Sequence, residues 1–135
     1  MKYYKVVREE DGILQSCIVT GHAKVIYKVG EWSIAPNDFA LYGYHILVFN
    51  NLIAAKKFAS EVESNCTISV YEIEVSGKIK LPKSGYFHPA NVGYQFIPEL
   101  IATKLFYFWP RYTRMFERVK LTNKVWSFNE ILQSS

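Results

Sequence analysis

The sequence lacks the features that mark secreted and membrane-spanning proteins. Its two cysteines, Cys17 and Cys66, are too few for a disulfide framework. The opening residues MKYYK have no apolar core of the kind a signal peptide needs, and no apolar run is long enough to cross a bilayer. We therefore expect a soluble, cytoplasmic protein that carries thiols rather than disulfides and does not act at a membrane.

Motifs for metals and nucleotides are missing as well. The three histidines, His22, His45 and His88, are isolated, and neither cysteine belongs to a Cys-x-x-Cys pair. The chain has no phosphate-binding loop and no glycine-rich dinucleotide fingerprint. The residues alone therefore predict neither a metal site nor a cofactor.

The composition is that of one folded domain. The chain has 135 residues, of which 50% are hydrophobic, so residues 1–135 can form a single domain with one core. Its formal net charge is +4. This mild excess of basic residues permits nucleic-acid binding, but it is not the dense basic run that would indicate it.

A strand–helix–strand unit in residues 44–80 organises the rest of the chain. Residues 44–49 and 68–75 have the apolar and β-branched composition of strands. Between them, apolar residues at helical spacing predict an amphipathic helix over residues 52–62, packed by one face on a sheet. Asn51 stands where a side chain can cap the first turn of that helix.

The sequence pattern predicts strands in the N-terminal part and mainly helices in the C-terminal third. Asp11-Gly12 predicts a hairpin between the first two strands, and we expect Trp32 to be an anchor packed at the sheet edge. Residues 98–109 read as an apolar helix that Pro110 ends, and this helix is a candidate for a homo-oligomer contact. The other expected C-terminal elements are a short helix at 110–118, a short strand at 119–121 and a terminal helix that begins near Ser127.

The expected fold class is therefore α+β. We predict a mostly antiparallel sheet of about five to seven strands, with the helix 52–62 packed on it and a helical C-terminal third. Residues 83–93, rich in glycine, proline, serine and asparagine, are expected to form a loop.

Basic and aromatic residues gather near the C-terminus. Arg111, Arg114 and Arg118 stand three and four residues apart and would share one face of a helix. Arginine beside aromatic rings suits the centre of a protein interface or a groove for single-stranded nucleic acid. The candidate binding residues are Tyr107, Trp109, Arg111, Tyr112, Arg114 and Arg118, together with Tyr86 and His88 in the loop.

Three segments of the central unit carry a resemblance to a known superfamily. Residues 45–49 (HILVF), 54–59 (AAKKFA) and 70–77 (VYEIEVSG) resemble the middle of ADP-ribosyltransferase-like domains, and residues 3–8 (YYKVVR) resemble their first strand. The pattern is also similar to that of small domains in phage and bacterial proteins. The resemblance covers about half of the chain and implies a cleft that binds NAD or another nucleotide.

Site residues follow from this resemblance by position. It implies that Arg8 holds phosphate, that Tyr44 or Phe49 stacks on the base, and that Glu117 or Glu130 is the catalytic acid. Neither glutamate lies in a motif like that of the superfamily, which favours use of the scaffold for binding rather than catalysis. A shared fold is in any case no warrant for a shared activity.

Three functional hypotheses result. The leading one is a small non-catalytic interaction protein, of the kind that phages and mobile elements encode, that acts on a macromolecular partner, and a protein partner is favoured over nucleic acid. The alternative is an ADP-ribosyltransferase-like enzyme with NAD as cofactor. The third is a nucleic-acid-binding protein that uses the basic, aromatic C-terminal segment.

Overall fold

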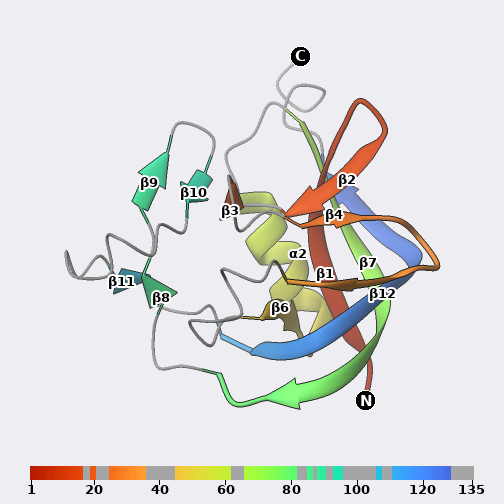
Figure 1. The fold of residues 1–135 in the computed structure, drawn as a ribbon. Coiled ribbons are helices and arrows are strands. Elements are labelled where there is room, and N and C mark those ends of the chain that lie inside the picture. The colour runs from red at the N-terminus through yellow and green to blue at the C-terminus, as the bar shows by residue number, and fades with distance from the viewer. Residues whose placement is uncertain are drawn as a thin grey trace.

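Strands, nearly all of them paired antiparallel, make up most of the described residues in the computed structural model (Figure 1). The structure describes residues 1–16, 19–20, 25–35, 45–61, 66–81, 85–86, 88–90, 93–95, 106–107 and 111–128. Their elements are β1 (Tyr3–Glu10), β2 (Ile13–Ser16), β3 (Val19–Thr20), β4 (Ile26–Tyr27), β5 (Trp32–Ile34), β6 (Ile46–Phe49), α2 (Leu52–Glu61), β7 (Thr67–Ile79), β8 (Gly85–Tyr86), β9 (His88–Ala90), β10 (Gly93–Gln95), β11 (Phe106–Tyr107) and β12 (Thr113–Phe128).

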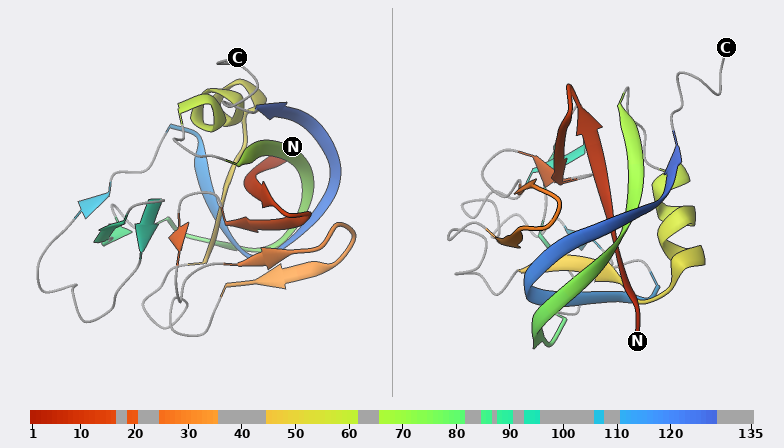
Figure 2. Two further views of the ribbon diagram at one scale, coloured as in Figure 1. Left: turned by 90° about the horizontal axis from the view of Figure 1, so that it is seen from above. Right: turned by 90° about the vertical axis from the view of Figure 1, so that its right-hand side faces the viewer.

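Four strands of the 7-stranded sheet close into a ring. Strands β1 and β12 each pair with both β6 and β7, and all four pairings are antiparallel. Figure 2 shows β7 and β12 curving around the ring when the molecule is seen from above. Closure removes free sheet edges from these strands.

Strands β2, β4 and β5 extend the ring at one end. Strand β2 pairs with β1 and β4, while β5 pairs with β12. Asp11 and Gly12 join β1 to β2 with φ angles of 52° and 78°, as a two-residue hairpin turn with both central residues at positive φ requires. The predicted hairpin at this dipeptide is therefore confirmed.

The core lies inside the ring. Side chains alternate between the two faces of a strand, so Val7 of β1 and Tyr71 of β7 point inward while Val6 and Val70 point outward. The buried residues of this interior cluster are Val7, Leu14, Val25, Tyr27, Ala35, Ile46, Val48, Tyr71, Ile73, Phe116, Val119 and Leu121.

Helix α2 packs on the outside of the ring, against β1 and β7. Ala55 and Ala59 are fully buried in this contact, and their small side chains let the helix approach the sheet closely. The Asn51 side-chain oxygen accepts a hydrogen bond from the Ala54 amide at 2.9 Å, so the predicted N-cap is confirmed, as is the strand–helix–strand unit. No helix in the described part of the chain is long and apolar enough to cross a membrane.

The α+β class with a helical C-terminal third is wrong. The described residues form mostly antiparallel β-sheet with the short helix α2. Residues 113–128 form the single long strand β12, which contains the expected strand at 119–121 and replaces the helices expected over residues 113–118 and from Ser127. Residues 106–107, expected in the helix 98–109, form β11, and the rest of that helix lies outside the described residues. The expected loop 83–93 contains strand residues of β8, β9 and β10.

The alternation of inward and outward side chains along β12 is interrupted, so its sequence pattern does not indicate a strand. Phe116 and Val119 both belong to the interior cluster although they are three residues apart, so the inward side changes between them. Two bulges follow, between Leu121 and Asn123 and between Lys124 and Trp126. The resulting spacing resembles a helical pattern, and pairing along β7 decides the outcome over local propensity.

A glycine permits the first of these interruptions. Gly77 of β7 has a φ of +73°, and a Cβ built there would lie 2.7 Å from Glu117 Oε2 and 2.9 Å from Glu117 Cβ. Positive φ is costly for residues with a Cβ. Gly77 therefore lets the Glu117 segment of β12 cross close to β7.

Replacing Gly77 tests this close crossing. Gly77→Ala should lower the free energy of unfolding by about 2 kcal/mol or more, because backbone strain and the contact with Glu117 add. Gly30→Ala is the control, because Gly30 has a φ of +84° with nothing within 4 Å of its Cβ, and it should lose about 1 kcal/mol. Urea unfolding measures both variants. Equal losses of unfolding free energy would show that the close crossing of β12 and β7 does not affect stability.

The cap of α2 gives a second prediction. Asn51→Ala removes the acceptor for the Ala54 amide and should cost about 1 kcal/mol of unfolding free energy. Asn51→Asp keeps an acceptor and adds a charge that is favourable at a helix N-terminus, so it should retain wild-type stability. Chemical unfolding followed by circular dichroism measures both variants, and an equal loss in the two would refute the capping role.

Candidate functional site

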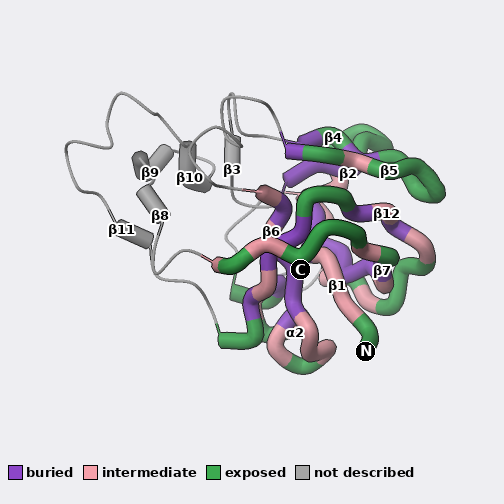
Figure 3. Tube along the Cα trace, turned by 60° about the horizontal axis from the view of Figure 1, so that its bottom comes forward, coloured by how far each residue is buried: buried purple, intermediate pink, exposed green. Residues whose placement is uncertain are grey.

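Large apolar side chains stand exposed on one outer part of the sheet. Ile13, Ile26, Val29, Trp32 and Ile34 are between 47% and 62% exposed, and they belong to β2, β4, β5 and the turn between β4 and β5. We call these five residues, with the neighbouring cations Lys28, Arg118 and Lys120, the hairpin face. Figure 3 shows the exposed residues of β4 and β5 at one extremity of the described fold.

Strand alternation explains why these side chains point outward. In β4, Tyr27 is buried in the interior cluster, so its neighbour Ile26 faces solvent. Ala35, which follows β5, is also part of that cluster, so Ile34 lies on the outer side. The strand residues of the hairpin face therefore lie on the outer surface of strands whose inner surface is core, and this gives the face a rigid support. Val29 lies in the turn between β4 and β5.

A cation stands opposite each of three apolar side chains of this face. Across the β5–β12 pairing, Lys120 is opposite Trp32 and Arg118 is opposite Ile34. The Lys120 ammonium lies 5.1 Å from the centre of the Trp32 ring and 2.7 Å from a Glu74 carboxylate oxygen. In the β2–β4 pairing, Leu14 is opposite Tyr27, and the same register places Ile13 opposite Lys28.

The three arginines of the expected helix face do not form one surface. Arg111 lies in the turn before β12, with its guanidinium 5.0 Å from the centre of the Tyr112 ring. Arg114 is opposite Val48, an interior residue, and donates to the Thr113 carbonyl oxygen at 2.8 Å. Arg118 is opposite the outward Ile34. Because the inward side changes after Phe116, Arg114 and Arg118 lie on different faces of the sheet.

The other predicted binding residues lie in the small sheets or outside the described residues. Tyr107 and Tyr86 belong to the paired strands β11 and β8, and His88 belongs to β9, which pairs with β10. The structure thus brings the backbones of Tyr107 and Tyr86 together. Trp109 lies outside the described residues.

The residues expected to line a nucleotide cleft do not converge where they are described. Arg8 is buried opposite Ile68, whereas Glu117 lies over Gly77, about 30 Å away along β7. Phe49 is buried outside the ring, with its ring centre 5.3 Å from that of Phe58, and so presents no open face to a base. Tyr44 and Glu130 lie outside the described residues.

A small polar group lies among the apolar side chains inside the ring. The Lys5 ammonium donates to the Leu47 carbonyl oxygen at 2.6 Å and lies 5.9 Å from the centre of the Tyr27 ring. The Ser16 hydroxyl accepts from the Val25 amide at 2.8 Å. Burial raises the pKa of Tyr27 far above its usual value, and a hydrogen bond with Ser16 opposes this only in part. These contacts fasten β1 to β6 and β2 to the β4 segment.

Comparison with known protein families, with curated proteins and with solved structures finds no match. The resemblance to ADP-ribosyltransferase-like domains therefore stays a prediction from the sequence. Among the residues that the structure describes, no group of three or more histidine, cysteine, aspartate or glutamate side chains is placed to hold a metal ion.

Sequence inspection missed the hairpin face. Trp32 was expected to pack as an anchor at the sheet edge. It does lie at the edge, in the end strand β5, but about half of its surface is exposed. The alternation of residues 25–29 does place Ile26 on the face opposite Val25 and Tyr27. That Ile26 lies on the solvent side depends on which face the core covers, and three-dimensional pairing decides this.

The buried Tyr27 gives a prediction for alkaline pH. The unfolded chain ionises this phenol above its ordinary pKa of about 10, while the folded protein keeps it neutral. Ionisation therefore stabilises the unfolded state as pH rises. Above about pH 10, wild type should lose about 1.4 kcal/mol more unfolding free energy per pH unit than Tyr27→Phe. Urea unfolding at several alkaline pH values measures this, and parallel curves for the two proteins would contradict it.

Proposed function

We propose that this protein is a small, non-catalytic binding protein that holds a macromolecular partner on the hairpin face. The observation that carries the proposal is the exposure of five large apolar residues on the paired strands β2 and β4, on β5 and in the turn that joins β4 to β5. They are Ile13, Ile26, Val29, Trp32 and Ile34. Large apolar side chains scattered singly over a surface are ordinary. A group of them on one part of a sheet, bordered by charged residues, is typical of a protein interaction site.

The energetics support this use of the face. Covering apolar surface contributes about 25 cal/mol per Å², so each half-exposed isoleucine can add about 1 kcal/mol to binding when it is buried by a partner. Tryptophan and arginine are the side chains that most often dominate an interface, and Trp32 and Arg118 supply both types on adjacent strands.

The hairpin face is already ordered before a partner binds, and this is a second observation in favour of the proposal. Val119, between Arg118 and Lys120, is fully buried inside the ring, and Gly30 of the turn donates its amide to the Leu121 carbonyl oxygen at 2.9 Å. The face is therefore fastened to the core from behind and at its tip. A surface that is already ordered loses little conformational entropy when a partner binds.

A selection from a random peptide library displayed on phage tests the proposal. The double variant Trp32→Ser/Ile34→Ser removes the centre of the hairpin face. Ile53→Ser is the matched control, because Ile53 is 78% exposed on α2, away from β5. Peptides selected on wild type should bind the control equally and the double variant at least about tenfold more weakly, which corresponds to about 1.4 kcal/mol.

All three proteins should unfold at similar temperatures, because the replaced side chains are exposed. If wild type selects no peptide, or if the selected peptides bind the double variant as well as they bind wild type, the proposed function is wrong.

A further inference from the structure

We propose that the partner of the hairpin face is an acidic segment of another protein, in which carboxylates alternate with large apolar side chains. This inference rests on the proposed function and names the chemistry of its partner. It is carried by two pairs across β5 and β12, Trp32 with Lys120 and Ile34 with Arg118. A third cation, Lys28, follows β4 at the position that continues the β2–β4 register to Ile13.

The spacing of these pairs fits an extended partner. Side chains directly opposite each other on antiparallel strands have Cβ atoms about 5 Å apart, so apolar and cationic groups lie side by side on the face. Trp32 and Ile34, two residues apart on β5, lie about 7 Å apart along it. A partner segment in which apolar and acidic residues alternate can therefore cover the apolar side chains and reach the cations.

Two of the cations are available to a partner. Within the part of the chain that the structure describes, neither Arg118 nor Lys28 forms an ion pair, and both are exposed. Arginine can bind a carboxylate through two parallel hydrogen bonds, so Arg118 is the residue that we expect to select an acidic partner. Lys120 is already paired with Glu74 and contributes less.

The composition of the face favours protein over nucleic acid. Four of its five apolar residues are aliphatic, whereas binding of single strands depends on aromatic rings with open faces. The ring of Trp32 is already close to the Lys120 ammonium.

A second copy of the chain is also a poorer partner. Each copy would bring the same exposed Arg118 and Lys28 to the contact, and like charges that face each other across an interface are unfavourable.

Three synthetic peptides test the partner's chemistry. In each peptide every second residue is apolar, either isoleucine or tryptophan, and the residues between them are all of one type. That type is glutamate in the first peptide, glutamine in the second and lysine in the third. Fluorescence anisotropy of the labelled peptides measures their affinity at low and high salt. We expect the glutamate peptide to bind at least about tenfold more tightly than the glutamine peptide, to lose most of that advantage at high salt, and the lysine peptide to bind most weakly.

Charge variants assign the effect to the face. Arg118→Gln combined with Lys28→Gln should remove most of the preference for the glutamate peptide, while binding of the glutamine peptide stays unchanged. Lys57→Gln is the control, because Lys57 is an exposed cation on α2, and it should keep the preference.

The outcomes separate this inference from the proposed function. If all three peptides bind equally, and the double variant Trp32→Ser/Ile34→Ser abolishes that binding, the function stands and the acidic partner is wrong. If a single-stranded oligonucleotide binds instead and Arg118→Gln abolishes it, the partner class is wrong. If wild type sediments as a dimer that the double variant dissociates, the occupant is a second copy. If no probe responds to the double variant, both proposals fail.

Discussion

The pairing of β12 with β7 is the interaction on which the rest of the structure depends. It runs from Met115 opposite Ile79 to Phe128 opposite Ile68. Both edges of each strand are in use, because β7 also pairs with β1, and β12 also pairs with β6 and β5. A long antiparallel pair twists and coils, and this curvature brings β6 into contact with β1 as well as β12. Closure of the ring, the enclosed core and the position of the hairpin face all follow from this one curved pair.

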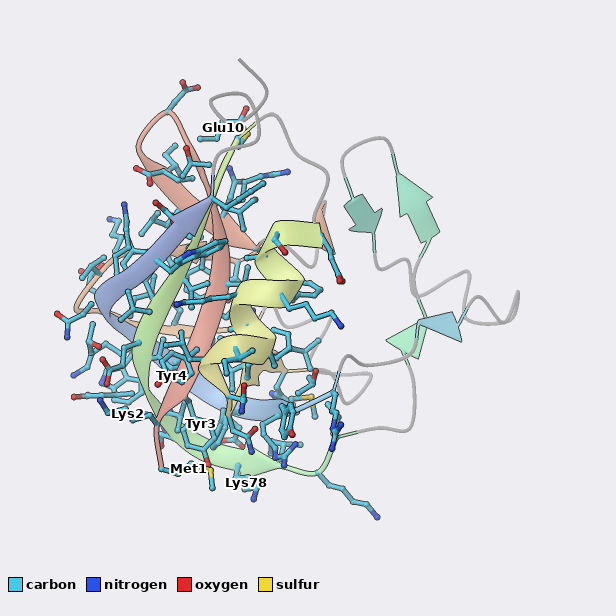
Figure 4. The ribbon with its side chains drawn as sticks, turned by 180° about the vertical axis from the view of Figure 1, so that it is seen from behind. Met1, Lys2, Tyr3, Tyr4, Glu10 and Lys78 are labelled. Atoms are coloured by element: carbon cyan, nitrogen blue, oxygen red, sulfur yellow. The ribbon has the colours of Figure 1, made fainter. Side chains whose placement is uncertain are left out.

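The outer side of the same pair explains the position of the helix. On the outer side, Ile68, Val70, Val6 and Phe49 form an apolar surface against which α2 packs. Figure 4 shows α2 lying along this side of the sheet, seen from behind. The sheet therefore has one outer region covered by a helix and another, on β4 and β5, that no described element covers. This contrast distinguishes the exposed isoleucines of the hairpin face from the apolar side chains that α2 covers.

Local signals in the sequence predicted the elements that local chemistry determines. Asp11-Gly12 requires a tight turn, Asn51 caps a helix, and residues 52–62 repeat with helical spacing, so the first hairpin and α2 could be read directly. The long strand β12 could not, because Gly77 and two bulges break its alternation. The same break put Arg114 and Arg118 on different faces and made a helical arginine surface the wrong expectation. The hairpin face depends on which side of β4 and β5 is covered, and the residues of those strands alone do not fix this.

The ring closes without β4 and β5, so sequence changes at the outward side chains of these two strands do not open it. β6 links β1 to β12 at one end, so the core does not depend on the side chains that point outward from the hairpin. Substitutions at Ile26 or Ile34 therefore leave the enclosed core unchanged. If the hairpin face binds a partner as proposed, this surface can change in sequence while the scaffold stays constant. Related chains would then share the β7–β12 pair and differ most in the hairpin.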